Sequence, residues 1–139
     1  MWVLPKPLPL ETFLRRSTPY SPMILTIIVN ESPYGSEKPW NALRLASTAL
    51  GMEPPTEVRV FLMGDAVAAA KSGQKTPEGY YNLEKMLSSI LRRGAQVLVC
   101  GTCIDSRGIS QDQLVEGVER GTMKALATWI AESQRVVSF

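Results

Sequence analysis

A run of apolar, mostly β-branched residues from Ile24 to Asn30 (ILTIIVN) most strongly limits how this chain can fold. The run lacks the alternation of a strand with one wet face, so it predicts a strand buried on both faces, as in parallel sheets. Further strands are predicted from Glu57 to Met63 (EVRVFLM), Ala95 to Val99 and Arg135 to Phe139 (RVVSF). Parallel neighbours need long crossover connections, and these are usually helices.

Helical patterns fill the intervals between the predicted strands. The predicted helices cover 36–51 with Ser36 as N-cap, 66–71, about 80–93, a short segment at 114–118 after a Ser110–Gln113 capping box, and a last helix opened by Thr122. Strands that alternate with helices predict an α/β fold with three layers. We expect a mainly parallel sheet of four or five strands, with helices on both faces.

The first 22 residues differ from the rest of the chain. They contain five prolines, which remove backbone donors and favour extended chain, and they show no helical or strand period. We therefore expect an extended arm or upstream extension at 1–22 and one α/β domain at 23–139. That domain carries 12 basic and 12 acidic residues, and without a basic stripe we expect no nucleic-acid partner.

Composition excludes several kinds of chemistry. The chain of 139 residues has no histidine, so Ser-His-Asp and Cys-His mechanisms are excluded within one chain. Two cysteines cannot build a four-cysteine zinc site alone, and we expect neither metal nor cofactor. No apolar run approaches the ~20 residues of a membrane-spanning helix. Without a secretory signal, the thiols favour the reducing cytoplasm.

Both cysteines flank a glycine at the end of the third predicted strand, in Cys100-Gly101-Thr102-Cys103. Loops at the carboxyl ends of parallel strands form the ligand crevice, where backbone amides favour the reactive thiolate. Strand alternation makes Cys100 the more buried residue and Cys103 the solvent-reachable one. We predict Cys103 as the nucleophile, while Cys100 either resolves a disulfide or fills space. The alternative is that both are small buried hydrophobic residues.

Other polar residues are expected around this crevice. The candidate binding residues are Asn30, Glu31, Tyr34, Gly101, Thr102 and Arg107. Arg107 is expected to pair with an anion, whereas a plain turn explains Asn30 to Gly35 equally well. Asp65 is expected to cap the following helix rather than face the crevice. A thioredoxin-like redox motif is disfavoured, because such a motif belongs at a helix start after an early strand.

Several motifs, taken in order, resemble the DsrE-like (DsrE/DsrF, YchN-like) family over 23–139. They are Asn30-Glu31 with Tyr34-Gly35-Ser36-Glu37, NALRLA at 41–46, FLMGDAV at 61–67, Gly79-Tyr80-Tyr81-Asn82, Cys100-Gly101-Thr102-Cys103 and Arg107-Gly108-Ile109. The resemblance implies an α/β domain that assembles as trimers or hexamers and handles sulfur. In sulfur-relay members a cysteine after the third main strand carries a persulfide, and by motif that residue corresponds to Cys103. Cys100 is a departure from the family pattern.

The sequence thus predicts a sulfur-handling protein, a persulfide carrier or sulfurtransferase, that uses Cys103. Its expected partners are copies of itself and a sulfur donor or acceptor protein, with no membrane. The alternative is a non-catalytic oligomeric binding module for a small anionic ligand or a protein partner. A Cys100–Cys103 redox switch is a third hypothesis.

Overall fold

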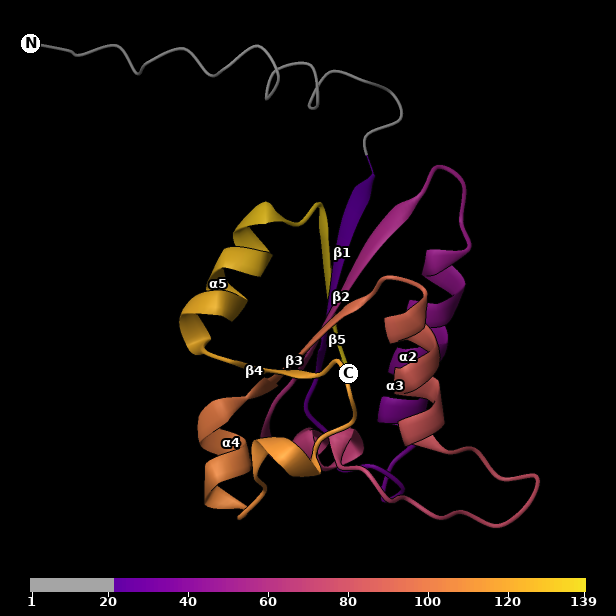
Figure 1. Ribbon diagram of the computed structural model, residues 1–139. Coiled ribbons are helices and arrows are strands. Elements are labelled where there is room, and N and C mark those ends of the chain that lie inside the picture. The colour runs from indigo at the N-terminus through magenta and orange to yellow at the C-terminus, as the bar shows by residue number, and fades with distance from the viewer. Residues whose placement is uncertain (1–21) are drawn as a thin grey trace, which may run out of the picture.

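Five parallel strands form one sheet in the computed structural model, which describes residues 22–139 (Figure 1). The strands are β1 (Met23–Val29), β2 (Thr56–Leu62), β3 (Gln96–Cys100), β4 (Glu119–Gly121) and β5 (Arg135–Ser138), in the order β4-β3-β2-β1-β5. All four neighbouring pairs run parallel. The predicted parallel sheet is confirmed, and the apolar strand β1 is an interior strand with a partner on each side.

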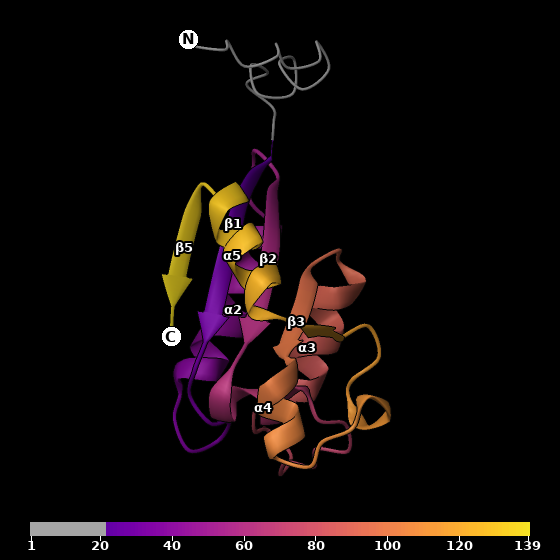
Figure 2. The ribbon, with the colours of Figure 1, turned by 90° about the vertical axis from the view of Figure 1, so that its left-hand side faces the viewer.

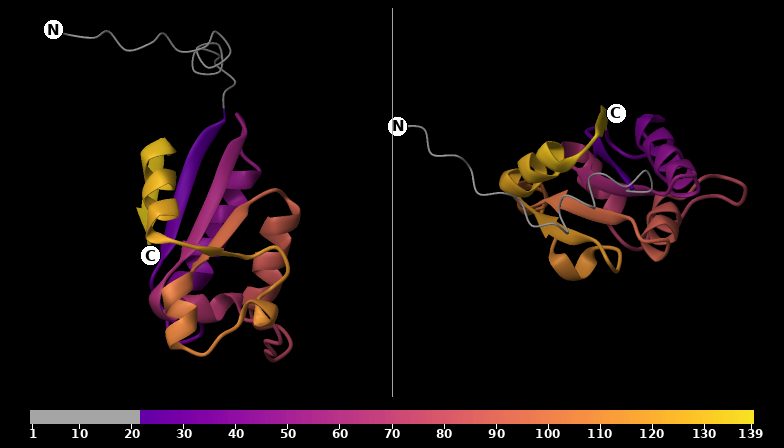
Figure 3. Two further views of the ribbon diagram at one scale, coloured as in Figure 1. Left: turned by 60° about the vertical axis from the view of Figure 1, so that its left-hand side comes forward. Right: turned by 90° about the horizontal axis from the view of Figure 1, so that it is seen from above.

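Helices cover both faces of the sheet, so the predicted three-layer α/β architecture is confirmed. The helices are α2 (Lys38–Leu50), α3 (Leu83–Arg92), α4 (Gly101–Ser106) and α5 (Met123–Glu132), with 3-10 helices η1 (Gly64–Ala70) and η2 (Gln111–Gln113). Helices α2 and α3 pack together on one face, and α5 lies on the other (Figures 1 and 3). Helix α4 lies beyond the carboxyl end of β3 (Figure 2).

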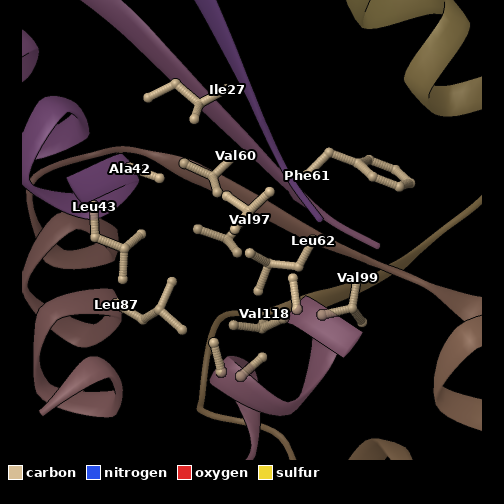
Figure 4. Packing of buried hydrophobic residues seen from close by; sticks show 14 of the residues in the cluster. Ile27, Ala42, Leu43, Val60, Phe61, Leu62, Leu87, Val97, Val99 and Val118 are labelled. Atoms are coloured by element: carbon tan, nitrogen blue, oxygen red, sulfur yellow. The ribbon is translucent and has the colours of Figure 1, made fainter. Parts of the chain in front are cut away.

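Side-chain alternation along β2 divides the core between the two faces. Val60 is fully buried on the side of Leu43 from α2 and Leu87 from α3 (Figure 4). Phe61 points the other way, and its ring meets Trp129 of α5 edge to face at a centroid distance of 6.2 Å. Because β1 and β2 have buried side chains on both faces, both faces at the centre of the sheet need a covering layer of helices.

A buried arginine joins α5 to the sheet. The Arg59 guanidinium donates to Glu132 at 2.6 Å and to Glu57 at 3.1 Å, and it lies 5.7 Å from the centre of the Trp129 ring. These contacts satisfy a charge that is only 8% exposed.

The segment predicted as a helix at 114–118 is not helical. Gly117 has a left-handed φ of +96°, which interrupts a right-handed helix. Val115 instead donates its amide to the carbonyl of Ala70 at 2.8 Å. The chain then enters the short strand β4. The capping box of Ser110 with Gln113 is present, but it starts only the single turn η2.

Two helix starts differ from the prediction. Helix α3 begins at Leu83 rather than near Tyr80, because the Asn82 side chain accepts the amide of Lys85 at 3.1 Å as the N-cap. The N-cap of α2 is Glu37, although the Ser36 hydroxyl accepts the amide of Lys38 at 3.1 Å.

Two further observations concern the amino-terminal segment and the helices. The predicted arm at 1–22 lies outside the described residues, apart from Pro22. Among the helices of 22–139, none has the length and hydropathy that a bilayer crossing requires.

Candidate functional site

The two cysteines lie where β3 passes directly into α4. Cys100 is the last strand residue and the N-cap of α4, and Cys103 is the third residue of that helix. The loop expected at the carboxyl end of the third strand is therefore absent, because the chain enters a helix directly at Gly101. The CxxC motif does begin a helix, so one reason for disfavouring a thioredoxin-like motif fails. Both thiols are free, Cys100 is 8% exposed, and Cys103 is partly exposed.

The Cys103 sulfur faces the start of η1. The backbone amide of Gly64 donates to Cys103 Sγ at 3.2 Å. Gly64 has a left-handed φ of +59°, a backbone conformation that glycine adopts without strain. The amide at the Cys103 sulfur is thus provided by the residue pair that follows the neighbouring strand β2.

A cation ties η1 to α4 beside this sulfur. Arg107 Nη2 donates to Asp65 Oδ1 at 2.8 Å, and Arg107 Nη1 donates to the Cys103 carbonyl at 3.1 Å. The expectation that Asp65 caps the following helix is wrong, because Met63 holds the N-cap position of η1, without a side-chain hydrogen bond. Arg107 therefore brings positive charge near Cys103, while its hydrogen bonds go to Asp65 and the backbone.

A second arginine, Arg120 on β4, packs against the start of α4. A Cβ atom on Gly101 would lie 2.7 Å from both Cζ and Nε of Arg120. The guanidinium also pairs with Asp105 of α4 through contacts of 2.8 and 2.6 Å. Gly101 is thus needed for the close approach of Arg120. The charge of Arg120 also attracts the thiolate form of Cys100.

The two thiols affect each other's ionisation. Burial opposes ionisation of Cys100, yet the Cys103 thiol, the Thr102 hydroxyl and the amides of both residues together lower the pKa of Cys100. Thr102 Oγ1 lies 3.3 Å from Cys100 Sγ. The Cys100 side chain makes no capping hydrogen bond to the amides of α4. Burial and the neighbouring Cys100 raise the pKa of Cys103, against the Gly64 amide and the Arg107 charge. The contacts around the two sulfurs therefore favour the thiolate more at Cys100 than at Cys103.

The polar residues after β1 make other contacts. Asn30 Nδ2 donates to Ser138 Oγ at 3.0 Å and to the Phe139 carbonyl at 3.2 Å, so its side chain holds β5. Glu31 pairs with Lys38 of α2 at 3.7 Å. The Asn30 carbonyl, however, lies beside Gly64, 3.7 Å from where a Cβ there would be. The loop end is near the site, and the binding roles of these two side chains stay predictions.

Tyr34 belongs to a row of aromatic rings between α2 and the connection before α3. Its hydroxyl donates to Gln74 and accepts the Leu83 amide at 3.1 Å. Its ring stacks on Tyr81 at 5.7 Å, and Tyr81 stacks on Trp40 at 5.1 Å. A binding role for Tyr34 stays a prediction.

Sequence reasoning missed Arg120 and the amide of Gly64. Arg120 reaches Gly101 only because β4 pairs with β3 in the register that sets Arg120 opposite Val99. The strand β4 itself has only three residues. Gly64 directly follows a predicted strand, where crevice residues are expected, and this position could have identified it as a site residue.

Other hollows of the surface lie away from the cysteines. A groove of about 390 Å³ runs between α2 and α3, and its lining includes Leu43, Arg44, Lys85 and Met86. In the described part of the chain, no group of three or more histidine, cysteine, aspartate or glutamate side chains is arranged to hold a metal ion. The chemistry that the β3–α4 junction supports is that of two thiols.

Comparison with known proteins adds to this geometry. The DsrE/DsrF-like family model matches residues 23–139. Protein YchN of Escherichia coli (strain K12) is 44% identical over 115 residues, which cover 83% of this chain and 97% of that protein. Uncharacterized protein MK0008 of Methanopyrus kandleri is 39% identical over 122 residues, 88% of this chain and 98% of that protein.

Solved structures show the same fold. The crystal structure of the E. coli ychN protein aligns with a TM-score of 0.79 at 43% identity, over 84% of this chain and 99% of that one. A protein of unknown function, MTH1491 from Methanobacterium thermoautotrophicum, aligns with a TM-score of 0.60 at 12% identity, over 84% and 98% of the two chains. At that identity, the second match bears on the fold alone.

Proposed function

Because the chain belongs to the DsrE/DsrF-like family, which is commonly linked to sulfur relay, we propose that it carries sulfur as a persulfide on Cys103. One observation supports this choice above the others. Cys103 is a partly exposed residue just beyond the carboxyl end of β3, and its sulfur accepts the Gly64 amide at 3.2 Å. A sulfur atom that is reachable, and that an amide stabilises as an anion, is what thiol exchange requires.

The loading step is a thiol exchange with a persulfide donor. The Cys103 thiolate attacks the outer sulfur of R–S–SH, a bond forms between the two sulfurs, and R–S⁻ leaves. The products are Cys103–S–SH and the donor thiolate, so no oxidant or metal is consumed. Before the attack the Cys103 proton passes to solvent, because the thiolate is the nucleophile.

The charges around the site support an anionic product. The Gly64 amide and the Arg107 guanidinium both favour the charged form of the Cys103 sulfur. A persulfide on Cys103 is ionised more readily than a thiol, so the same groups hold it more strongly. Delivery to an acceptor thiol then needs only access to the outer sulfur.

Mass spectrometry of the loaded protein tests the proposal. Reduced full-length chain is mixed anaerobically with a low-molecular-weight persulfide, and samples are quenched at early times. We expect a gain of about 32 Da, one sulfur atom, in wild type and in Cys100→Ser. Cys103→Ser is expected to show no gain. No adduct in wild type or Cys100→Ser, or an undiminished adduct in Cys103→Ser, would contradict the proposal.

We also propose that the chain forms a homo-oligomer, a trimer or hexamer, and exchanges sulfur with a donor or acceptor protein. Exposed apolar side chains on α5 and β5 support self-association, since Met123 is 63%, Ile130 42% and Val136 40% exposed. Light scattering on the full chain tests the assembly, and a monomeric mass across concentrations would contradict it.

A further inference from the structure

We propose that Cys100 resolves the Cys103 persulfide: it attacks the inner sulfur, closes a Cys100–Cys103 disulfide and expels the outer sulfur as sulfide. The step rests on the persulfide function proposed above, and it gives the second cysteine a role of its own. In the absence of an acceptor, the loaded chain then discharges itself.

The positions of the two cysteines on α4 carry this proposal. Cys100 is the N-cap and Cys103 the third helical residue. In the first turn of a helix the N-cap side chain reaches toward this third position, as it does in a capping box. Residues one helical turn apart lie within the Cα separation that a disulfide spans, so the spacing of the two cysteines permits closure.

Because Cys100 and Cys103 differ in exposure, the outer and inner sulfurs of the persulfide are attacked by different thiols. Cys103 is partly exposed, so a donor or acceptor arriving from solvent reaches its outer sulfur. Cys100 is 8% exposed and lies on the strand side of the same turn. External thiols therefore meet the outer sulfur, while Cys100 approaches from within the fold and attacks the inner one.

The atoms and electrons of the step balance without an external oxidant. Cys100–SH and Cys103–S–S⁻ give Cys100–S–S–Cys103 and HS⁻, with one negative charge on each side. The Cys100 proton moves to the departing sulfur. The carried sulfur is reduced to sulfide, and the two cysteines are oxidised to the disulfide. A dithiol reductant would return the pair to its free state.

The surroundings of Cys100 favour a nucleophilic role over space filling. Burial acts against ionisation, but contacts with the Cys103 thiol and with Thr102, whose Oγ1 lies 3.3 Å from Cys100 Sγ, lower the pKa of Cys100. Arg120 adds positive charge, and it packs close because Gly101 has no side chain. A buried cysteine among apolar neighbours alone would have its pKa raised.

The test follows the fate of one loaded sulfur. Reduced full chain is loaded anaerobically with about one equivalent of a low-molecular-weight persulfide, freed of small molecules and sampled over time. In wild type we expect the adduct of about 32 Da to decay to a species about 2 Da lighter than the reduced chain, with about one sulfide released. In Cys100→Ser the adduct should last at least roughly tenfold longer, without sulfide release.

The outcomes separate this inference from the proposed function. Equal adduct lifetimes in wild type and Cys100→Ser, with no intramolecular disulfide, would overturn the resolving role and leave the carrier function standing. No loading of either protein would overturn the carrier function, and the resolving role with it. If Cys100→Ser fails to fold, Cys100→Ala replaces it. Wild type decides alone if both fail, since a persistent adduct contradicts the inference and a disulfide with released sulfide supports it.

Discussion

A missing side chain, at Gly101, lets the guanidinium of Arg120 pack against the start of α4. Arg120 then pairs with Asp105 and holds the pKa of that carboxyl below its usual range. The colliding atoms are the far end of a flexible side chain, so the fold can accommodate a methyl group at Gly101 by moving Arg120. The glycine therefore matters more for the charges around Cys100 than for folding.

Gly101→Ala tests this role of the glycine. We expect the pKa of Asp105 to rise, because the displaced guanidinium no longer favours the carboxylate. NMR titration measures the pKa, and the free energy of unfolding should change by less than ~1 kcal/mol. Gly35→Ala is the matched control, since a Cβ there would meet only Ser32 at 4.0 Å. An unchanged Asp105 pKa in Gly101→Ala would show that Arg120 keeps its place.

Thr102→Val tests how the Cys100 thiol ionises. The Thr102 hydroxyl lowers the pKa of Cys100, so its removal should raise that pKa and shift thiolate formation to higher pH. The ultraviolet absorbance of the thiolate, followed across pH, measures the shift. Thr128→Val on α5 is the control, because that hydroxyl bonds to the Lys124 carbonyl, away from the cysteines. Identical titration curves for the two variants would argue against this account.

At the scale of elements, the site is made by the meeting of η1 and α4. The Arg107–Asp65 pair joins the two elements and holds the Gly64 amide next to Cys103. The pair is part-exposed, so we ascribe to it alignment of the site rather than a large share of stability.

Arg107→Gln in the Cys100→Ser background isolates this alignment. The Arg107 charge lowers the pKa of Cys103, so its loss should raise that pKa and move the pH midpoint of alkylation upward. Alkylation rates by mass spectrometry across pH provide the measurement. Arg92→Gln, on the last turn of α3, is the control in the same background. A midpoint that moves downward, or does not move, would contradict the role given to Arg107.

Long apolar elements could be predicted from the sequence, whereas short ones could not. The uninterrupted apolar run at β1 and the apolar face of α3 are long enough to be recognised in the sequence. The strand β4 has three residues, of which only Gly121 is buried, so it has no strand pattern. Helix α4 starts at a glycine directly after a strand, which reads as a turn.

The same limit applies to the candidate site. The cysteine pair could be found because both residues belong to one motif of four consecutive residues. The contacts of Arg120 and Gly64 depend on how separate elements are placed, and no local pattern encodes that placement. Asn30 was predicted from its place after a strand, yet its side chain bonds to β5, which lies far along the chain.

At the scale of the whole molecule, the packed sheet provides stability, whereas the chemistry lies at the carboxyl end of β3. Gly121 on β4 faces a tightly packed region, where an added Cβ would lie 2.9 Å from Phe61 Cε2 and 3.1 Å from Leu98 Cβ. These neighbours belong to the buried sheet and cannot withdraw as a long charged side chain can. A glycine near the cysteines and one in the core thus have different consequences.

Gly121→Ala is therefore expected to cost about 1–3 kcal/mol of unfolding free energy through overpacking. Denaturant titration of Gly121→Ala, Gly101→Ala and Gly35→Ala measures the three effects under the same conditions. We expect only Gly121→Ala to lose more than ~1 kcal/mol. A loss as large in Gly101→Ala would mean that Arg120 cannot move as proposed.

The most direct test of the account is to locate the carried sulfur within the peptide that contains both cysteines. Reduced chain is loaded with a persulfide, quenched before discharge, digested and fragmented in the mass spectrometer. The account predicts the added mass of about 32 Da on Cys103. Added sulfur on Cys100 alone, or on neither cysteine, would contradict it.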